Sequence, residues 1–167
     1  MVKVLFVCWG NICRSPMAEF VMKDLVARAG LESRIEVASA ATSSEEVGNP
    51  VYPPARTELG RHGLSAVGKR ARKMTKADYE EYDYLIGMEQ LNLRYMLKIC
   101  GGDPERKMSL LMDHTGRSEE IDDPWYTGDF AGVYRQILRG CEALLQEIRQ
   151  EWLPEGSGKA SGRKKRR

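Results

Sequence analysis

The sequence predicts a three-layer α/β protein in which a four-stranded parallel sheet carries helices on both faces. Short runs rich in β-branched and aromatic residues alternate with stretches whose apolar residues recur every three or four positions. Parallel neighbours need a crossover connection, and this alternation supplies a helix for it. With 167 residues, the chain is long enough for one domain of ordinary size.

Four segments have the composition of strands. Residues 2–7 form a short apolar run, which is the pattern of a strand buried on both faces. The other three predicted strands are residues 35–38, 84–88 and 108–112.

Helices are predicted between and after these strands. Ser15 and Pro16 have the chemistry of a helix cap and first helical position, and Gly30 is placed to end that helix. Further helices are predicted over residues 55–62, 90–99 and 130–152, the last from its apolar periodicity, and residues 75–78 resemble a short capped helix. Residues 42–54, 64–73 and 116–128 lack periodicity and are expected to form loops.

Charge divides the chain into two parts. The net charge is +2, but six of the 26 basic residues fall within the last nine positions. Residues 1–158 therefore carry 20 basic against 24 acidic side chains. We expect a folded domain over residues 1–154 and a disordered basic tail over residues 155–167. Such a tail suits an acidic partner, either nucleic acid or an anionic membrane.

Four cysteines in a chain of this size make a poor disulfide framework, which indicates a reducing compartment. No stretch approaches the roughly 20 apolar residues that a membrane helix needs. We therefore expect a cytoplasmic protein. No cluster has metal-ligand spacing, and we expect neither a metal nor another cofactor.

The loop after the first strand carries the chemistry. Positions 8–15 read C-W-G-N-I-C-R-S, and a loop that leads into a helix N-terminus presents backbone N–H groups to a dianion. We expect Gly10 to adopt a conformation closed to other residues. Arg14 adds a planar fork for two phosphoryl oxygens. These surroundings stabilise a thiolate at Cys8, so the loop predicts nucleophilic phosphoryl transfer.

A leaving alkoxide or phenolate also gains from a nearby acid, an effect worth ~10²–10⁴ in rate. The polar segment before the last helix supplies four carboxylates: Glu119, Glu120, Asp122 and Asp123. Their spacing alone does not choose among them.

With these motifs, the chain resembles the low-molecular-weight protein tyrosine phosphatases. Their signature V-C-[hydrophobic]-G-N-I-C-R-S-P matches positions 7–16, and segments 39–43, 70–72, 87–93 and 123–126 follow in family order. The resemblance extends through Leu153. It implies that family's fold and hydrolysis of aryl phosphate monoesters through a phosphocysteine. The implied substrate is a phosphotyrosine protein or a small aryl phosphate.

The resemblance also implies residue roles. Cys8 would be the nucleophile and Asp123 the general acid, which later activates water. Arg14 would hold the phosphate together with the backbone N–H groups of the loop, contributed by Trp9, Gly10, Asn11, Ile12, Cys13 and Arg14.

Further positions match supporting roles in the family. Asn11, Ser15 and Ser39 would shape the loop and support the thiolate. Trp9, Trp125 and Tyr126 would wall the cleft. Cys13 matches a cysteine that can join the nucleophile in a reversible disulfide.

Several positions depart from the family pattern. Glu45 and Glu46 replace Trp-His at the cleft rim, and carboxylates there would disfavour acidic phosphopeptides. Lys69 stands where some relatives have a His that contacts the phosphate-loop Asn, which removes the basis for that contact at Asn11. Trp9 replaces a smaller apolar residue.

Three other functions would fit parts of this sequence pattern. A protein-arginine phosphatase on this scaffold resembles C-T-G-N-T-C-R, whereas Ile12 offers nothing to a guanidinium. An arsenate reductase relays oxidation through neighbouring cysteines, and Cys100 has none nearby in sequence. A phosphate-binding module would not need both Cys8 and Asp123.

Overall fold

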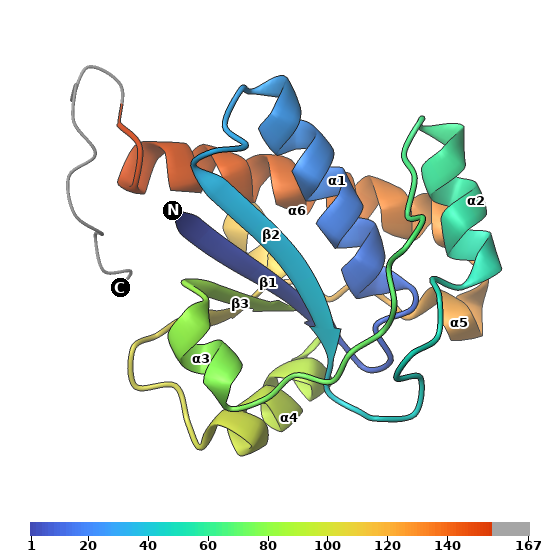
Figure 1. Ribbon diagram of the computed structural model, residues 1–167, viewed down its shortest axis with the longest axis horizontal. Coiled ribbons are helices and arrows are strands. Elements are labelled where there is room, and N and C mark those ends of the chain that lie inside the picture. The colour runs from blue at the N-terminus through green and yellow to red at the C-terminus, as the bar shows by residue number, and fades with distance from the viewer. Residues whose placement is uncertain (155–167) are drawn as a thin grey trace.

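The computed structural model describes residues 1–154 and contains a four-stranded sheet. The strands are β1 (Val2–Cys8), β2 (Ile35–Ala41), β3 (Tyr84–Gly87) and β4 (Met108–Leu110). All neighbouring strands are parallel, and their order is β2-β1-β3-β4. The predicted α/β fold is confirmed (Figure 1).

Within residues 1–154, six α-helices and one 3₁₀ helix surround this sheet. They are α1 (Arg14–Arg28), α2 (Pro53–Arg61), α3 (Ala77–Glu81), α4 (Gln90–Cys100), η1 (Leu111–Thr115), α5 (Pro124–Thr127) and α6 (Phe130–Glu151).

The alternation of side chains along β1 creates the three layers. Val4 and Phe6 point into a core shared with α1 and α6, while Leu5 and Val7 point into a second core. That second core is closed by side chains from α3 and α4, including Met96. Because successive strand residues face opposite sides, a strand with apolar residues on both faces needs helices on both faces.

The first helix begins earlier than predicted. Cys13 is its N-cap residue, and Ser15 and Pro16 occupy the second and third helical positions. The predicted cap at Ser15 is wrong because that hydroxyl lies against the Cys8 sulfur instead. Pro16 fits the first turn because the N–H groups there have no intrahelical partner.

Other boundaries also differ from the prediction. The strand predicted over residues 108–112 ends at Leu110, and the remaining two residues of the predicted strand belong to η1. The segment predicted as a loop over residues 116–128 contains α5, which is capped by the Asp123 carboxylate. A four-residue helix is too short to show an apolar period, so only the cap and the following proline could have indicated it.

The connections place a crevice at the carboxyl ends of the central strands. β1 leads into α1 on one face of the sheet, and β3 leads into α4 on the other. The loops after these two adjacent strands therefore lead to opposite faces of the sheet and leave a crevice between them. In open α/β sheets, ligands bind in this kind of crevice.

A close approach of α6 to η1 depends on Gly140. A Cβ added at this glycine would lie 2.5 Å from Leu111 Cγ. We expect Gly140→Ala to lower the free energy of unfolding by about 1–3 kcal/mol through overpacking, measured by urea denaturation. Gly60→Ala in α2 is the matched control, because no atom lies within 4 Å of its added Cβ. Equal unfolding free energies for both variants would contradict this packing argument.

The predicted basic tail, residues 155–167, and its expected contact with nucleic acid or membrane lie outside the described residues. Within residues 1–154, no helix is both long enough and apolar enough to cross a membrane.

Candidate active site

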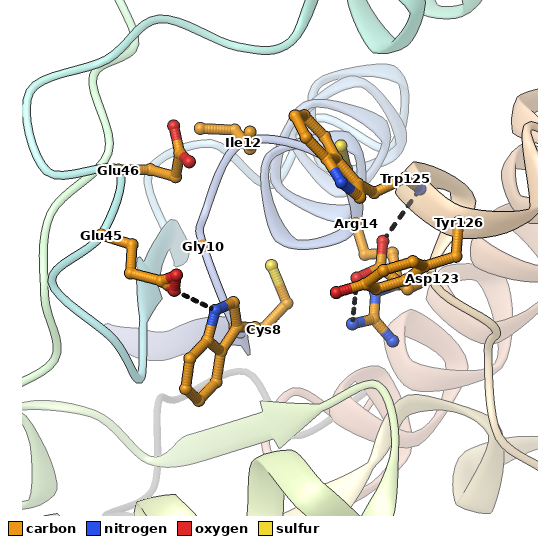
Figure 2. Close-up of a pocket in the computed structure, with 11 residues that line it drawn as sticks. Cys8, Gly10, Ile12, Arg14, Glu45, Glu46, Asp123, Trp125 and Tyr126 are labelled. Atoms are coloured by element: carbon orange, nitrogen blue, oxygen red, sulfur yellow. Dashed lines mark hydrogen bonds and ion pairs between the residues drawn. The ribbon is translucent and has the colours of Figure 1, made fainter.

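The thiol of Cys8 lies at the bottom of a pocket where β1 ends (Figure 2). Its sulfur is 3.3 Å from the backbone N of Asn11 and 3.0 Å from Ser15 Oγ. Both groups can donate to a sulfur that carries negative charge, and such bonds to an ionised acceptor are the stronger kind.

The loop that surrounds this sulfur is bent at Asn11, whose φ is +59°. Asparagine tolerates this left-handed conformation better than most residues. The expected special conformation at Gly10 is wrong, since Gly10 is not among the residues with positive φ. Its lack of a side chain instead gives room to Glu46, whose Cγ would lie 3.2 Å from an added Cβ.

The Asn11 side chain fixes the direction of a hydrogen-bond network. Its Oδ1 accepts from the Arg72 backbone N at 3.2 Å, so its Nδ2 is oriented toward two hydroxyls. That nitrogen donates to Ser15 Oγ at 2.7 Å and to Ser39 Oγ at 2.9 Å. Because the Ser15 oxygen accepts from Asn11, its hydrogen can point at the Cys8 sulfur, 3.0 Å away, for which the Ala40 carbonyl at 3.5 Å is the more distant competitor.

Lys69 and Glu19 anchor the far end of this network. Ser39 Oγ donates to Glu19 Oε1 at 2.5 Å, and Lys69 Nζ donates to the Ser39 carbonyl at 2.9 Å. Burial lowers the pKa of Lys69, while the Glu19 carboxylate 3.3 Å away opposes that effect. Lys69 thus reaches the loop through Ser39, which in turn accepts from Asn11.

Removing the Lys69 amine is expected to destabilise the folded protein. Lys69→Met leaves Glu19, which is 4% exposed, with one ion-pair partner fewer. We expect the free energy of unfolding to fall by about 1–3 kcal/mol. Lys23→Met is the control, because Lys23 pairs with the same carboxylate from a side chain that is 46% exposed. The control should lose less than about 1 kcal/mol, and equal losses would refute the assigned role of Lys69.

The Arg14 guanidinium is buried in the first turn of α1 and held by three oxygens. It lies 2.6 Å from Glu89 Oε2 and 3.5 Å from Asp123 Oδ2, and it donates to the Ile121 carbonyl at 2.8 Å. Burial acts to lower its pKa, but the charges of Cys8, Asp123 and Glu89 outweigh that effect and raise it. Arg14 therefore remains positively charged, and these three oxygens hold its guanidinium in a defined orientation.

Glu89 has no role predicted from the sequence motifs. This residue follows β3, so it reaches Arg14 only because β3 lies beside β1 in the sheet. Its position just beyond the carboxyl end of a parallel strand was the signal that could have indicated it.

The structure distinguishes the four candidate carboxylates. Asp123 lines the pocket, and its Oδ1 accepts from the Trp125 backbone N at 3.0 Å. Asp122 is exposed and does not line the pocket. Glu119 approaches Arg139 at 3.8 Å, and Glu120 accepts from the Gln90 backbone N. Asp123 is thus the one of the four that lies beside the thiol pocket.

Aromatic side chains wall the pocket, whose volume is about 150 Å³. Cavities of about this size accept a benzene ring. Trp125 and Tyr126 stand on one side, where Trp125 rests on Tyr52 with ring centroids 4.6 Å apart. Trp9 stands on another side, with its ring meeting Tyr95 edge-on at 5.4 Å.

The loop after β2 completes the rim. Glu45 and Glu46 line the pocket opposite Trp125 and Tyr126 (Figure 2). The expectation that these two carboxylates face the cleft therefore agrees with their placement in the structure.

Cys13 lines the same pocket and is buried. Burial, followed by the negative charges of Cys8 and Asp123, raises the pKa of its thiol. Burial likewise raises the pKa of Cys100 and Cys141, which lie in the two cores. Within residues 1–154, no three His, Cys, Asp or Glu side chains are gathered so that they could hold a metal ion.

Comparison with known proteins agrees with this geometry. A sequence profile described as low molecular weight phosphotyrosine protein phosphatase matches residues 3–153. The chain belongs to the low molecular weight phosphotyrosine protein phosphatase family. The resemblance inferred from the motifs is confirmed.

Members of this family resemble the chain in sequence and in structure. YfkJ of Bacillus subtilis, a low molecular weight protein-tyrosine-phosphatase, is 39% identical over 153 residues, covering 90% of this chain and 98% of that protein. Its crystal structure gives a TM-score of 0.87, with 90% of this chain and 96% of that chain covered. The phosphatase of Homo sapiens is 39% identical, covering 86% of this chain and 94% of the relative.

One structural neighbour is named for a different substrate. The crystal structure of DARP, a Drosophila arginine phosphatase, gives a TM-score of 0.79 at 36% identity. It covers 88% of this chain and 98% of its own.

Proposed function

We propose that this protein hydrolyses phosphotyrosine and other aryl phosphate monoesters. The observation that carries the proposal is the meeting of three groups at one pocket: Cys8, Arg14 and Asp123. They come from the end of β1, the first turn of α1 and the cap of α5. Relatives named for tyrosine phosphatase activity support the same reaction.

In the first proposed step, the Cys8 sulfur attacks the phosphorus atom. An S–P bond forms while the bond from phosphorus to the aryl oxygen breaks. Arg14 and the loop N–H groups stabilise the phosphoryl oxygens, and these donors are already in place before reaction. Asp123 gives its proton to the departing aryl oxygen.

In the second step, a water molecule attacks the phosphocysteine. The Asp123 carboxylate takes a proton from that water, the S–P bond breaks and inorganic phosphate leaves. The sulfur departs as a thiolate, and the Ser15 hydroxyl and the Asn11 N–H stabilise it.

The pocket walls support an aryl substrate. Trp9, Trp125 and Tyr126 offer ring faces and edges to a phenyl group, and Ile12 adds an apolar contact near the loop. A phosphorylated guanidinium would need an acceptor at position 12, where Ile12 supplies none.

The alternative on this scaffold is a protein-arginine phosphatase. Because the structure is similar to that of the Drosophila arginine phosphatase, phosphoarginine is the substrate to compare with phosphotyrosine. Phosphate release should be measured from one peptide that carries either phosphotyrosine or phosphoarginine at the same position. We expect a kcat/KM at least about tenfold higher for phosphotyrosine, about 1.4 kcal/mol in transition-state stabilisation. A higher kcat/KM for phosphoarginine would reject the proposal in favour of the alternative.

An arsenate reductase is not favoured. Its relay needs cysteines close to one another, but Cys100 ends α4 inside the core on one face of the sheet. Cys141 lies in the core on the other face, so neither thiol lines the pocket.

We further propose that Cys13 is the redox partner of Cys8 in a cytoplasmic enzyme. A peroxide would oxidise Cys8 to a sulfenic acid, and the Cys13 thiol would condense with it to give a disulfide and water. Both residues line one pocket, which supports the pairing. Peptide mapping after peroxide treatment should find the Cys8–Cys13 disulfide, and a sulfinic acid at Cys8 without it would reject the proposal.

A further inference from the structure

The charged groups of the pocket lie at two levels. Arg14 is at the bottom, 1% exposed, beside the carboxylates of Glu89 and Asp123. Glu45 and Glu46 lie at the rim, on the side across from Trp125 and Tyr126 (Figure 2). The bottom of the pocket therefore binds the phosphoryl group. The rim contacts the part of the substrate that is attached to the aryl ring, which in a protein is the flanking peptide.

Both rim carboxylates are held by neutral donors. Glu45 Oε2 accepts from Trp9 Nε1 at 3.0 Å, and Glu46 Oε1 accepts from Asn49 Nδ2 at 2.8 Å. Neither carboxylate forms an ion pair with any residue of the described chain, 1–154. Arg70 reaches this loop, but it donates to the Gly48 carbonyl instead. The two negative charges at the rim are therefore fixed in place and uncompensated.

Glu45 is also coupled to a wall of the pocket. Its bond to the Trp9 indole holds a ring that also meets Tyr95 edge-on, so the carboxylate has a defined position next to the aromatic slot. A charge that is fixed before binding loses less conformational entropy when a partner arrives.

We propose that Glu45 and Glu46 set the peptide preference of this phosphatase by selecting phosphotyrosine flanked by lysine or arginine. The inference rests on the proposed function and names its substrate class. A peptide whose phosphotyrosine enters the slot must cross the rim, which brings its neighbouring side chains toward the two carboxylates. Flanking cations are attracted there, and flanking carboxylates are repelled.

The expected effect follows from the exposure of the rim. A single exposed ion pair changes an equilibrium by about 1.4- to 5-fold. For two flanking positions we expect kcat/KM to be about 5- to 20-fold higher with lysines than with glutamates. The ratio should fall when ionic strength rises to about 1 M, where the Debye length is about 3 Å.

The experiment uses three matched phosphotyrosine peptides, with lysine, alanine or glutamate on each side of the phosphotyrosine. For each enzyme, the readout is the ratio of kcat/KM for the lysine peptide to that for the glutamate peptide. This ratio cancels any loss of folded protein. The test variant is Glu45→Gln/Glu46→Gln, in which the amide oxygens can still accept from Trp9 and Asn49.

The control variant is Glu32→Gln/Glu80→Gln. It removes the same net charge from exposed positions that do not line the pocket. We expect the ratio to approach one in the rim variant and to stay at the wild-type value in the control.

Equal kcat/KM for the lysine and glutamate peptides in the wild type would overturn the inference while leaving the proposed function intact. A ratio that survives in the rim variant, or that falls equally in the control, would also overturn it. Failure to cleave any of the three peptides would reject the proposed function itself, and this inference with it.

Discussion

Cys8→Ser is expected to abolish turnover, with kcat for phosphotyrosine hydrolysis falling by at least about 10⁴-fold. The serine hydroxyl is a much weaker nucleophile than a thiolate, and it leaves phosphorus less readily in the second step. Arg14 and the loop N–H groups are untouched by the change. Inorganic phosphate should therefore still raise the thermal unfolding temperature of the variant, which separates lost chemistry from lost binding.

Cys100→Ser is the matched control for this substitution. Cys100 is also a buried thiol, but it lies at the end of α4 in the core that does not contact the pocket. We expect its kcat to stay within about twofold of wild type, since surface and remote changes rarely alter a distant site. Turnover of Cys8→Ser within tenfold of wild type would reject Cys8 as the nucleophile.

Asp123→Asn is expected to lower kcat/KM for phosphotyrosine by about 10²–10⁴. An asparagine can still accept from the Trp125 backbone N and so preserve the cap of α5. It has no proton to give to the leaving oxygen and takes none from water. The loss should be smaller for p-nitrophenyl phosphate, because its leaving group departs with less need of an acid.

The neighbouring aspartate provides the comparison. Asp122→Asn makes the same chemical change one residue away, at an exposed side chain that does not line the pocket. Its kcat/KM should match that of wild type for both substrates. An equal loss in the two variants, or no loss at Asp123, would contradict the assignment of the general acid.

The sequence predicted the layers and the loop because both are local patterns. The apolar run of β1 requires cover on both faces, and residues 8–15 lie between a strand and a helix wherever the rest of the chain goes. The helix start was misplaced for a related reason. A serine followed by a proline resembles a cap, but the partner of Ser15 is Cys8, which the cap pattern does not include.

The partners of Arg14 could not be predicted in the same way. Glu89 and the Ile121 carbonyl reach it from segments far along the chain, and only the strand order brings them together. Lys69 is a second example. It differs from the His of some relatives, yet its amine reaches the same network through the Ser39 carbonyl, a contact that no spacing rule reveals.

Trapping the phosphoenzyme is the decisive test of the phosphocysteine mechanism. Asp123→Asn, in which the second step is slowed, should be mixed with p-nitrophenyl phosphate, whose leaving group departs with little need of an acid in the first step. The reaction should then be quenched with denaturant and the protein digested for mass spectrometry. The phosphocysteine mechanism predicts one phosphoryl group per chain on the peptide that contains Cys8, formed together with a stoichiometric burst of p-nitrophenol. A phosphoryl group on any other residue, or a burst without any phosphoenzyme, would contradict it.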